Sequence, residues 1–242
     1  MNTARPAFYA ARPGSWRDWW TILHPPYTAW HVSYVVIGAT LAPTTDGGRL
    51  AGTLLAFFLA VGVAAHALDE LHGRPLRTNI PGRVLVSGAA FALGVALILG
   101  VVGVSRTGVG LVPFIVVGPF LVLGYNLELF GGVVHSDFGF AAAWGAFPVL
   151  TAYFVQAERL DLTALLAATA ALALALAQRS LSTQARLVRR NAEQVDGTMT
   201  MYDGSVQRID DRALLAPIER ALRYMSLATV ALAIALLVAR VW

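Results

Sequence analysis

Long apolar stretches, separated by short polar ones, are the main feature of the chain. Seven of them approach the roughly 20 residues that an α-helix needs to cross a bilayer, at residues 27–41, 50–68, 84–104, 109–124, 138–155, 162–177 and 224–241. Only structures that pair their own backbone polar groups can cross lipid, and α-helices do so within one segment. The pattern therefore predicts an all-α integral membrane protein, a single domain over residues 1–242 built as a bundle of about seven transmembrane helices.

The composition agrees with this class and narrows the chemistry. Hydrophobic residues make up 57% of the 242 residues, charged residues only 13%, and the mean hydropathy is +0.63, which excludes an ordinary soluble domain. The chain has no cysteine, so disulfides and thiolate metal sites are excluded. All 18 basic residues are arginine, a side chain suited to phosphates and anionic headgroups. The expected partners are the lipid bilayer and an apolar substrate, not nucleic acid.

Arginine is distributed unevenly between the two ends of the predicted bundle. Only four of the 18 arginines fall on one side, namely Arg49, Arg106, Arg159 and Arg240. By the positive-inside rule the other side faces the cytoplasm, which places the N-terminus inside, in what we expect to be a prokaryotic plasma membrane. Residues 1–24, with Arg5, Arg12, Arg17 and three tryptophans, are predicted to be interfacial, and residues 179–223 to form a basic cytoplasmic loop.

The second apolar run ends in a cluster of ionisable residues at positions 66–74. His66 has Asp69 and Glu70 three and four residues later, which places all three on one helical face, and His72 and Arg74 follow. Carboxylate oxygens suit Mg²⁺, whereas imidazole together with carboxylate suits Zn²⁺, Mn²⁺ or Fe. The spacing permits a metal site without selecting the metal.

A second polar cluster follows the fourth apolar run, on the same predicted side of the membrane. It consists of Tyr125, Asn126, Glu128, His135 and Asp137. Together the two clusters supply seven candidate metal ligands, which are His66, Asp69, Glu70, His72, Glu128, His135 and Asp137. We expect them to face one another in a shared site on the cytoplasmic face, whereas His24 and His31 are expected to be interfacial anchors.

Four phrases of the sequence occur in an order known from one family. They are His24-Pro25-Pro26 leading into Val36-Ile37-Gly38-Ala39; Asp69 followed by Arg77-Thr78 and Ile80-Pro81-Gly82; Tyr125-Asn126 ahead of Trp144-Gly145-Ala146-Phe147-Pro148; and the basic stretch after residue 177. Over about residues 17–195 the chain resembles the UbiA-type superfamily of intramembrane prenyltransferases. The resemblance implies a helical bundle that holds a polyprenyl diphosphate and Mg²⁺ at the cytoplasmic ends of its helices.

The chain departs from that family's two aspartate-rich motifs. In the first motif only Asp69 keeps its place, next to Ala65, His66 and Gly73. In the second, arginines such as Arg179 and Arg186 stand where aspartates are expected. Two Mg²⁺ ions bridging a diphosphate would lack half of their ligands, and arginines could bind the phosphates directly instead.

Two enzymatic functions are therefore expected as alternatives. In the first, prenyl transfer or cyclisation, the catalytic residues are Asp69, Glu70, Tyr125 and Asp137, with Mg²⁺, and the substrate-binding residues are Arg74, Arg77, Asn126 and Arg186. Aromatic faces would shield the allylic cation, from Tyr27, Tyr34, Tyr125 and Trp144. In the second, His66, His72, His135 and the carboxylates bind Zn²⁺, Fe or Mn²⁺ for hydrolytic or oxidative chemistry on a lipid. A non-catalytic transporter or assembly partner is a third possibility, although no inverted repeat is evident.

Overall fold

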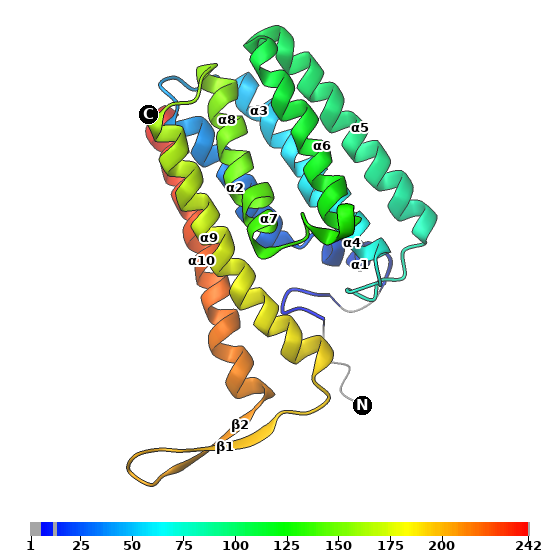
Figure 1. The fold of residues 1–242 in the computed structure, drawn as a ribbon, viewed down its shortest axis with the longest axis vertical. Helices are drawn as coiled ribbons and strands as arrows, with labels where there is room; N and C mark the ends of the chain where they lie inside the picture. The colour runs from blue at the N-terminus through cyan, green and yellow to red at the C-terminus, as the bar shows by residue number, and fades with distance from the viewer. Residues whose placement is uncertain (1–5, 12–13, 242) are drawn as a thin grey trace.

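The computed structural model describes residues 6–11 and 14–241, so Arg5 and Arg12 of the predicted interfacial segment lie outside the described residues. The fold is an all-α bundle (Figure 1). Its α-helices are α1 (Ser15–Ile22), α2 (Pro25–Leu41), α3 (Gly47–Phe57), α4 (His66–Leu71), α5 (Gly82–Thr107), α6 (Val112–Asn126), α7 (Asp137–Ala141), α8 (Phe147–Ala157), α9 (Leu162–Arg186) and α10 (Asp211–Val241).

Short segments of other helical types accompany these α-helices. Three are π-helical, namely η1 (Phe58–Ala65), η4 (Ala142–Ala146) and η5 (Leu187–Asn191). Two are 3₁₀-helical, η2 (Val109–Leu111) and η3 (Phe130–Gly132). As a result α3, η1 and α4 form one continuous span, as do α7, η4 and α8.

Six helices of the described chain are long and apolar enough to cross a membrane. They cover Gly47–Leu71, Gly82–Thr107, Val109–Asn126, Asp137–Ala157, Leu162–Asn191 and Asp211–Arg240. The all-α membrane class is thereby confirmed, with six such helices where the apolar runs predicted about seven. The difference is α2, which matches the first predicted run but has only 17 residues, the lower end of the length that spans a bilayer.

Helix α2 lies inside the bundle, where it packs against α8 and α10. Its side chains Trp30 and Tyr34 are almost fully buried, and Trp30 Nε1 donates a hydrogen bond of 2.6 Å to Tyr34 Oη. A Cβ atom at Gly38 would lie 2.4 Å from the carbonyl oxygen of Val149 on α8. The two helices therefore approach closely only because position 38 has no side chain.

Helices α9 and α10 run side by side and extend well beyond the other helices (Figure 1). Between them, β1 (Asp196–Thr200) and β2 (Val206–Asp210) form an antiparallel hairpin in which Asp196 pairs with Asp210. The predicted basic loop over 179–223 is thus wrong, because helix continues to residue 191 and resumes at 211. An ion pair of 2.5 Å between Arg189 and Glu219 joins the two extensions.

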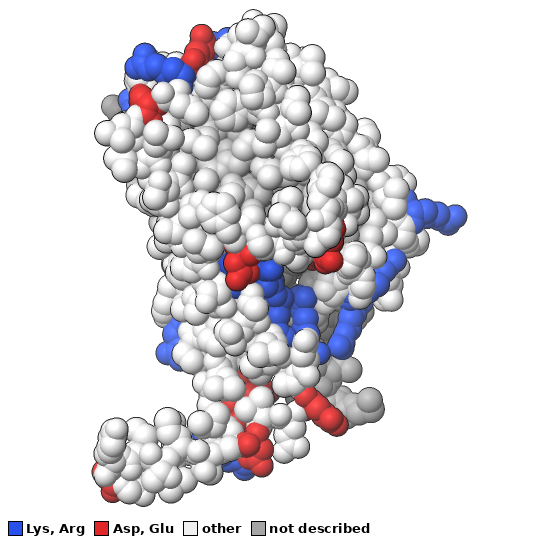
Figure 2. All heavy atoms as spheres, in the orientation of Figure 1, with Lys and Arg blue, Asp and Glu red and all other residues white. Residues whose placement is uncertain are grey.

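Charged side chains gather at the two ends of the molecule and leave an uncharged band between them (Figure 2). Such a band is what the hydrocarbon layer of a membrane requires. At the end that carries the hairpin, arginines line a recess between the bundle and the α9–α10 extension (Figure 2).

Candidate functional site

Both polar clusters predicted from the sequence line a single cavity of about 380 Å³ at the hairpin end of the bundle. His66, Asp69 and His72 reach it from the end of the α3–η1–α4 rod, and Tyr125, Asn126, Glu128 and His135 from α6 and the loop that follows. His72 Nε2 lies 3.9 Å from Glu128 Oε1, and His135 Nδ1 lies 4.0 Å from the same oxygen. The expectation that the two clusters share one site is confirmed.

Each of the three π-helical segments contributes to the wall of this cavity. Val61 and Ala65 come from η1, Trp144 from η4, and Arg189 and Arg190 from η5. A π-helical turn inserts one extra residue per turn and redirects the side chains that follow, and such turns are frequent at functional sites. Three of them around one cavity support its assignment as the functional site.

All five histidines of the chain line this cavity, namely His24, His31, His66, His72 and His135. In four of them Nδ1 lies 2.7–3.2 Å from a backbone carbonyl oxygen, the acceptors being Ile22 for His24, Trp144 for His31, Gly62 for His66 and Tyr125 for His135. Because a carbonyl only accepts, Nδ1 carries the proton, and in the neutral ring Nε2 is left as a lone-pair acceptor. The backbone thus fixes the same tautomer in four imidazoles.

His24 and His31 line the cavity. The sequence had suggested that they were interfacial anchors. Both are buried, and the His24 ring lies 4.2 Å from the ring of His66, centroid to centroid. Burial lowers the pKa of His24 well below its usual range, and the adjacent His66 lowers it further. His24 is therefore a neutral imidazole at neutral pH. Its position before Pro25 and Pro26 concealed this role, because that sequence resembles an ordinary helix start.

Asp69 and Glu70 are adjacent in the sequence but have different surroundings. The Asp69 carboxylate lines the cavity and forms no hydrogen bond with any described residue. Glu70 is fully buried on the other side of α4, where it accepts hydrogen bonds of 2.9 Å from the backbone N–H of Leu76 and of Thr78 and one of 2.8 Å from Thr78 Oγ1. The expected catalytic and metal-binding roles of Glu70 are therefore wrong, since its carboxylate holds the loop after α4.

Arg74 and Arg77, expected to bind substrate, belong to that same loop and do not line the cavity. Arg74 Nη1 donates a hydrogen bond of 2.6 Å to the carbonyl oxygen of Ile80. Both residues have positive φ angles, 54° and 56°, a region that L-residues rarely adopt. The turn directs the two side chains away from the site, and no helical periodicity in the sequence could indicate this.

The wall opposite Asp69 consists of four arginines on α9 and η5, namely Arg179, Arg186, Arg189 and Arg190. Arg179 Nε donates to Asp137 Oδ1 at 3.0 Å. Asp137 itself does not line the cavity, contrary to the position expected for a catalytic and metal-binding residue. Arg186, expected from the sequence, is half-buried in the middle of the wall.

Aromatic rings form the inner part of the cavity. Tyr125 stacks on His135 with 4.4 Å between ring centroids and meets the edge of Trp144 at 5.8 Å. Its hydroxyl is buried and has no hydrogen-bond partner among the described residues. Asn126 donates to the Val122 carbonyl at 2.8 Å. Tyr34 does not line the cavity, because it is buried in the core beside Trp30.

An N-terminal segment that sequence reasoning did not include also lines the cavity. Pro6, Phe8 and Tyr9 contact it, and Arg190 Nε donates to the Pro6 carbonyl at 3.3 Å. Burial raises the pKa of the Tyr9 phenol well above its usual range, and Tyr27 raises it further. Tyr9 therefore keeps its proton as a hydrogen-bond donor to a ligand. Only the folding of this segment over the bundle could reveal it.

Among the described residues, no three His, Asp or Glu side chains come close enough together to bind one metal ion. The carboxylates that line the cavity are Asp69, Glu128 and Glu219, and Glu219 is already paired with Arg189. Mg²⁺ is often bound by one or two carboxylates, with waters and substrate phosphates completing its shell. The donor set thus fits a single Mg²⁺ at Asp69, completed by substrate, and does not fit a pair of ions.

A second cavity, of about 320 Å³, adjoins the first inside the bundle. It is lined almost entirely by apolar residues of α3, η1, α5, α6 and α8, among them Phe57, Leu97, Phe114 and Phe147. Val61 and Trp144 line both spaces. A polar chamber and an apolar groove therefore meet at these two side chains.

No family model, no curated protein and no solved structure matches this chain. The site is therefore interpreted from its own geometry.

Proposed function

We propose that this protein is an intramembrane enzyme that acts on a prenyl diphosphate, either transferring the prenyl group to an acceptor or cyclising it. One observation supports this function above all. The arginine-lined polar cavity adjoins an apolar groove at Val61 and Trp144, which line both spaces, and this arrangement suits a molecule with an anionic head and a long hydrocarbon tail.

The chemistry begins with cleavage of the bond between the first carbon and its phosphate oxygen. The electron pair leaves with the diphosphate, and an allylic cation remains. Arginine guanidinium groups stabilise the charge that develops on the leaving oxygens, and Arg186, which lines the cavity, would do so here. One Mg²⁺ at Asp69, when bound, would add further positive charge on the diphosphate.

The cation is then attacked by the π electrons of an acceptor, or by a double bond of its own chain, and a proton is lost. Trp144 lines both the polar and the apolar space, and the Tyr125 ring in the polar space lies 5.8 Å from it, centroid to centroid. An aromatic face attracts a cation by about 0.5–2 kcal/mol, so these rings would stabilise the intermediate and keep water from it.

Product analysis tests this function. The purified protein is incubated in detergent with Mg²⁺ and geranyl, farnesyl or geranylgeranyl diphosphate, and released pyrophosphate and prenylated products are measured. We expect turnover that falls at least about 100-fold in Asp69→Asn, since this substitution removes a charge that assists departure of the leaving group. Asp203→Asn, a carboxylate outside the cavity, is the matched control. No pyrophosphate release from any of these substrates by folded protein would refute the proposal.

A second function is favoured by the five histidines that line the cavity. In this alternative a Zn²⁺, Fe or Mn²⁺ ion assembles imidazoles and a carboxylate for hydrolytic or oxidative chemistry on a lipid. Metal analysis of purified protein separates the two. Stoichiometric Zn or Fe that is lost in His66→Ala or His135→Ala would favour this alternative over the prenyl diphosphate enzyme.

We further propose that the cavity opens to the cytoplasm of a prokaryotic cell, because it lies at the arginine-rich end of the bundle. The chain has no cysteine, so one introduced thiol can report its own side. Asp203→Cys, on the exposed turn of the hairpin, should react with a membrane-impermeant maleimide in inverted vesicles and not in intact spheroplasts. The opposite labelling would reverse the orientation.

A further inference from the structure

The α9–η5 wall has the wrong chemistry for binding a divalent cation. From Leu162 to Asn191 the sequence contains neither aspartate nor glutamate. The carboxylates that line the rest of the cavity are Asp69, Glu128 and Glu219, and Glu219 is already paired with Arg189. The negative charge on the side of the diphosphate that faces α9 must therefore be balanced by groups other than a metal ion.

The same wall supplies arginines, and three of the four already have partners. Arg179 is paired with Asp137 at 3.0 Å, and Arg189 with Glu219 at 2.5 Å. Arg190 donates through Nε to the carbonyl oxygen of Pro6. These contacts hold the wall in place and leave Arg186 between them.

Arg186 differs from these three in having no partner outside its own helix among the described residues. Its Nη2 donates a hydrogen bond of 3.0 Å to Thr183 Oγ1 on its own helix, and it pairs with no carboxylate among the described residues. A guanidinium in a half-buried position normally has an anionic or carbonyl partner. Its planar fork can donate two parallel hydrogen bonds to a phosphate group. Arg186 therefore has the geometry and the free donors to bind a ligand anion.

Neutral donors surround this position. Tyr9, Tyr27, Gln178 and Ser182 line the cavity with Arg186. The Oε1 atom of Gln178 is buried and has no hydrogen-bond partner among the described residues. An acceptor left unsatisfied in a cavity requires a donor from water, a protonated phosphate or another ligand. The cavity therefore offers neutral polar groups to a ligand as well as the arginine.

We propose that the α9–η5 wall binds the diphosphate group directly through Arg186, so that a diphosphate binds in this cavity without a divalent cation. Identification of the ligand as a diphosphate depends on the proposed function, whereas the metal-free mode of binding does not depend on turnover. Mg²⁺ at Asp69 then assists bond cleavage and is not needed for binding.

Calorimetric titration tests this on the full chain in phosphatidylcholine nanodiscs. Inorganic pyrophosphate is titrated with EDTA present and, separately, with Mg²⁺. We expect saturable binding in EDTA, with a dissociation constant within about tenfold of that with Mg²⁺. Loss of pyrophosphate binding in EDTA would overturn the proposal, and this arm needs no variant.

Substitutions identify the residue. Arg186→Gln should weaken pyrophosphate binding in EDTA at least about tenfold, and Arg186→Lys less, because lysine keeps the charge but loses the fork. Arg83→Gln is the matched control, since Arg83 is exposed and does not line the cavity. Binding that is unchanged in folded Arg186→Gln would overturn the assignment to Arg186.

Two further experiments make two distinctions. One distinguishes a diphosphate from an anionic lipid headgroup as the ligand, and the other distinguishes failure of this inference from failure of the proposed function. Phosphatidylglycerol added to the nanodiscs should leave pyrophosphate binding unchanged, and complete competition would instead assign the site to an anionic lipid headgroup. Metal-free pyrophosphate binding together with no turnover of any prenyl diphosphate would refute the proposed function and retain this inference. Turnover of a prenyl diphosphate together with pyrophosphate binding that strictly requires Mg²⁺ would retain the proposed function and refute this inference.

Discussion

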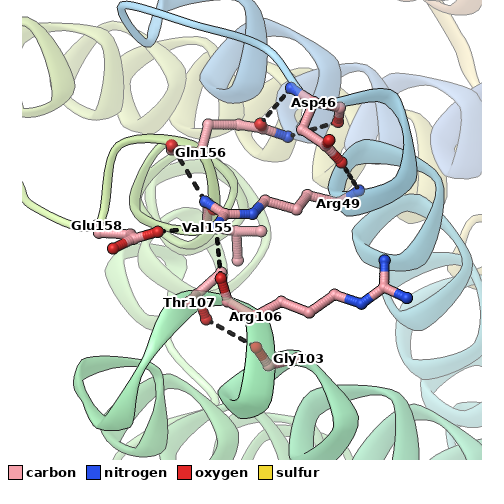
Figure 3. A network of polar contacts seen from close by, with 8 residues as sticks. All are labelled: Asp46, Arg49, Gly103, Arg106, Thr107, Val155, Gln156 and Glu158. Atoms are coloured by element: carbon pink, nitrogen blue, oxygen red, sulfur yellow. Dashed lines mark hydrogen bonds and ion pairs between the residues drawn. The ribbon is translucent and has the colours of Figure 1, made fainter.

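The two ends of the bundle each carry arginines, but they use them differently. At the end away from the hairpin, Arg49 donates to the carbonyl oxygens of Val155, Gln156 and Arg106 and to Glu158 (Figure 3). These acceptors lie at the C-terminal ends of α5 and α8, where carbonyls lack intrahelical partners. Arg49 thus joins three helices and has little capacity left for a ligand.

At the other end Arg186 faces a cavity and has one hydrogen bond, to its own helix. Arg49 precedes the apolar run at 50–68 and Arg186 follows the run at 162–177, and neither position in the sequence shows which protein acceptors the guanidinium reaches. What differs is the number of protein acceptors within reach. A saturated guanidinium is structural, whereas an unsaturated one in a cavity is available for binding.

The largest expected effect applies this contrast to two adjacent carboxylates. Glu70→Ala should lower the free energy of unfolding by about 3 kcal/mol, because it leaves two buried backbone N–H groups without acceptors. Asp69→Ala should change it by less than about 0.5 kcal/mol, because that carboxylate has no protein hydrogen bond to lose. Thermal or denaturant unfolding of both variants in the same detergent provides the measurement. Equal losses of stability would remove the distinction between the two residues.

A smaller effect is expected at the Arg49 network. Arg49→Met should cost about 2 kcal/mol of stability, since several carbonyls lose a charged donor at partly exposed helix ends. Arg106→Met is the control, because Arg106 takes part through its backbone carbonyl while its side chain points away (Figure 3). We expect the Arg106 variant to unfold within about 0.5 kcal/mol of the unaltered protein. If the two variants lose the same stability, the network does not depend on the guanidinium of Arg49.

The smallest effect concerns the junction between polar and apolar spaces. Val61→Phe adds bulk where the two cavities meet, so it should weaken geranylgeranyl diphosphate binding by about tenfold, or about 1.4 kcal/mol. Inorganic pyrophosphate has no tail and should bind as before. A parallel loss for both ligands would mean that the apolar groove does not hold the tail. Titration of both ligands into each protein checks this.

Much of the helical framework follows from the sequence because lipid permits few alternatives. The apolar runs predicted most spans to within a few residues, as with 84–104 against Gly82–Thr107. The exceptions are the runs 162–177 and 224–241, whose helices extend much further, over Leu162–Asn191 and Asp211–Arg240. The stretch 179–223 was predicted as a loop because its arginines interrupt the apolar pattern. Arginine is nevertheless a good helix former. Outside the membrane the two helices continue side by side, and the Arg189–Glu219 ion pair joins them.

The candidate site was predictable where helical spacing applied and not elsewhere. His66 and Asp69 were found because residues three apart share a helical face. Glu70 was misassigned because its neighbours on the other side of α4 come from the loop that follows, a tertiary contact.

The sequence by itself determined the class of protein, the approximate helices and the polar clusters, because hydrophobicity and period are local properties. Only the tertiary structure decided which charged groups are saturated. The fold supplies hydrogen-bond partners from other segments to Asp137, Glu70, Arg74 and Arg49. Asp69 and Arg186 have none and line the same cavity. Hydrogen-bond satisfaction depends on atoms distant in the chain, and no local pattern encodes it.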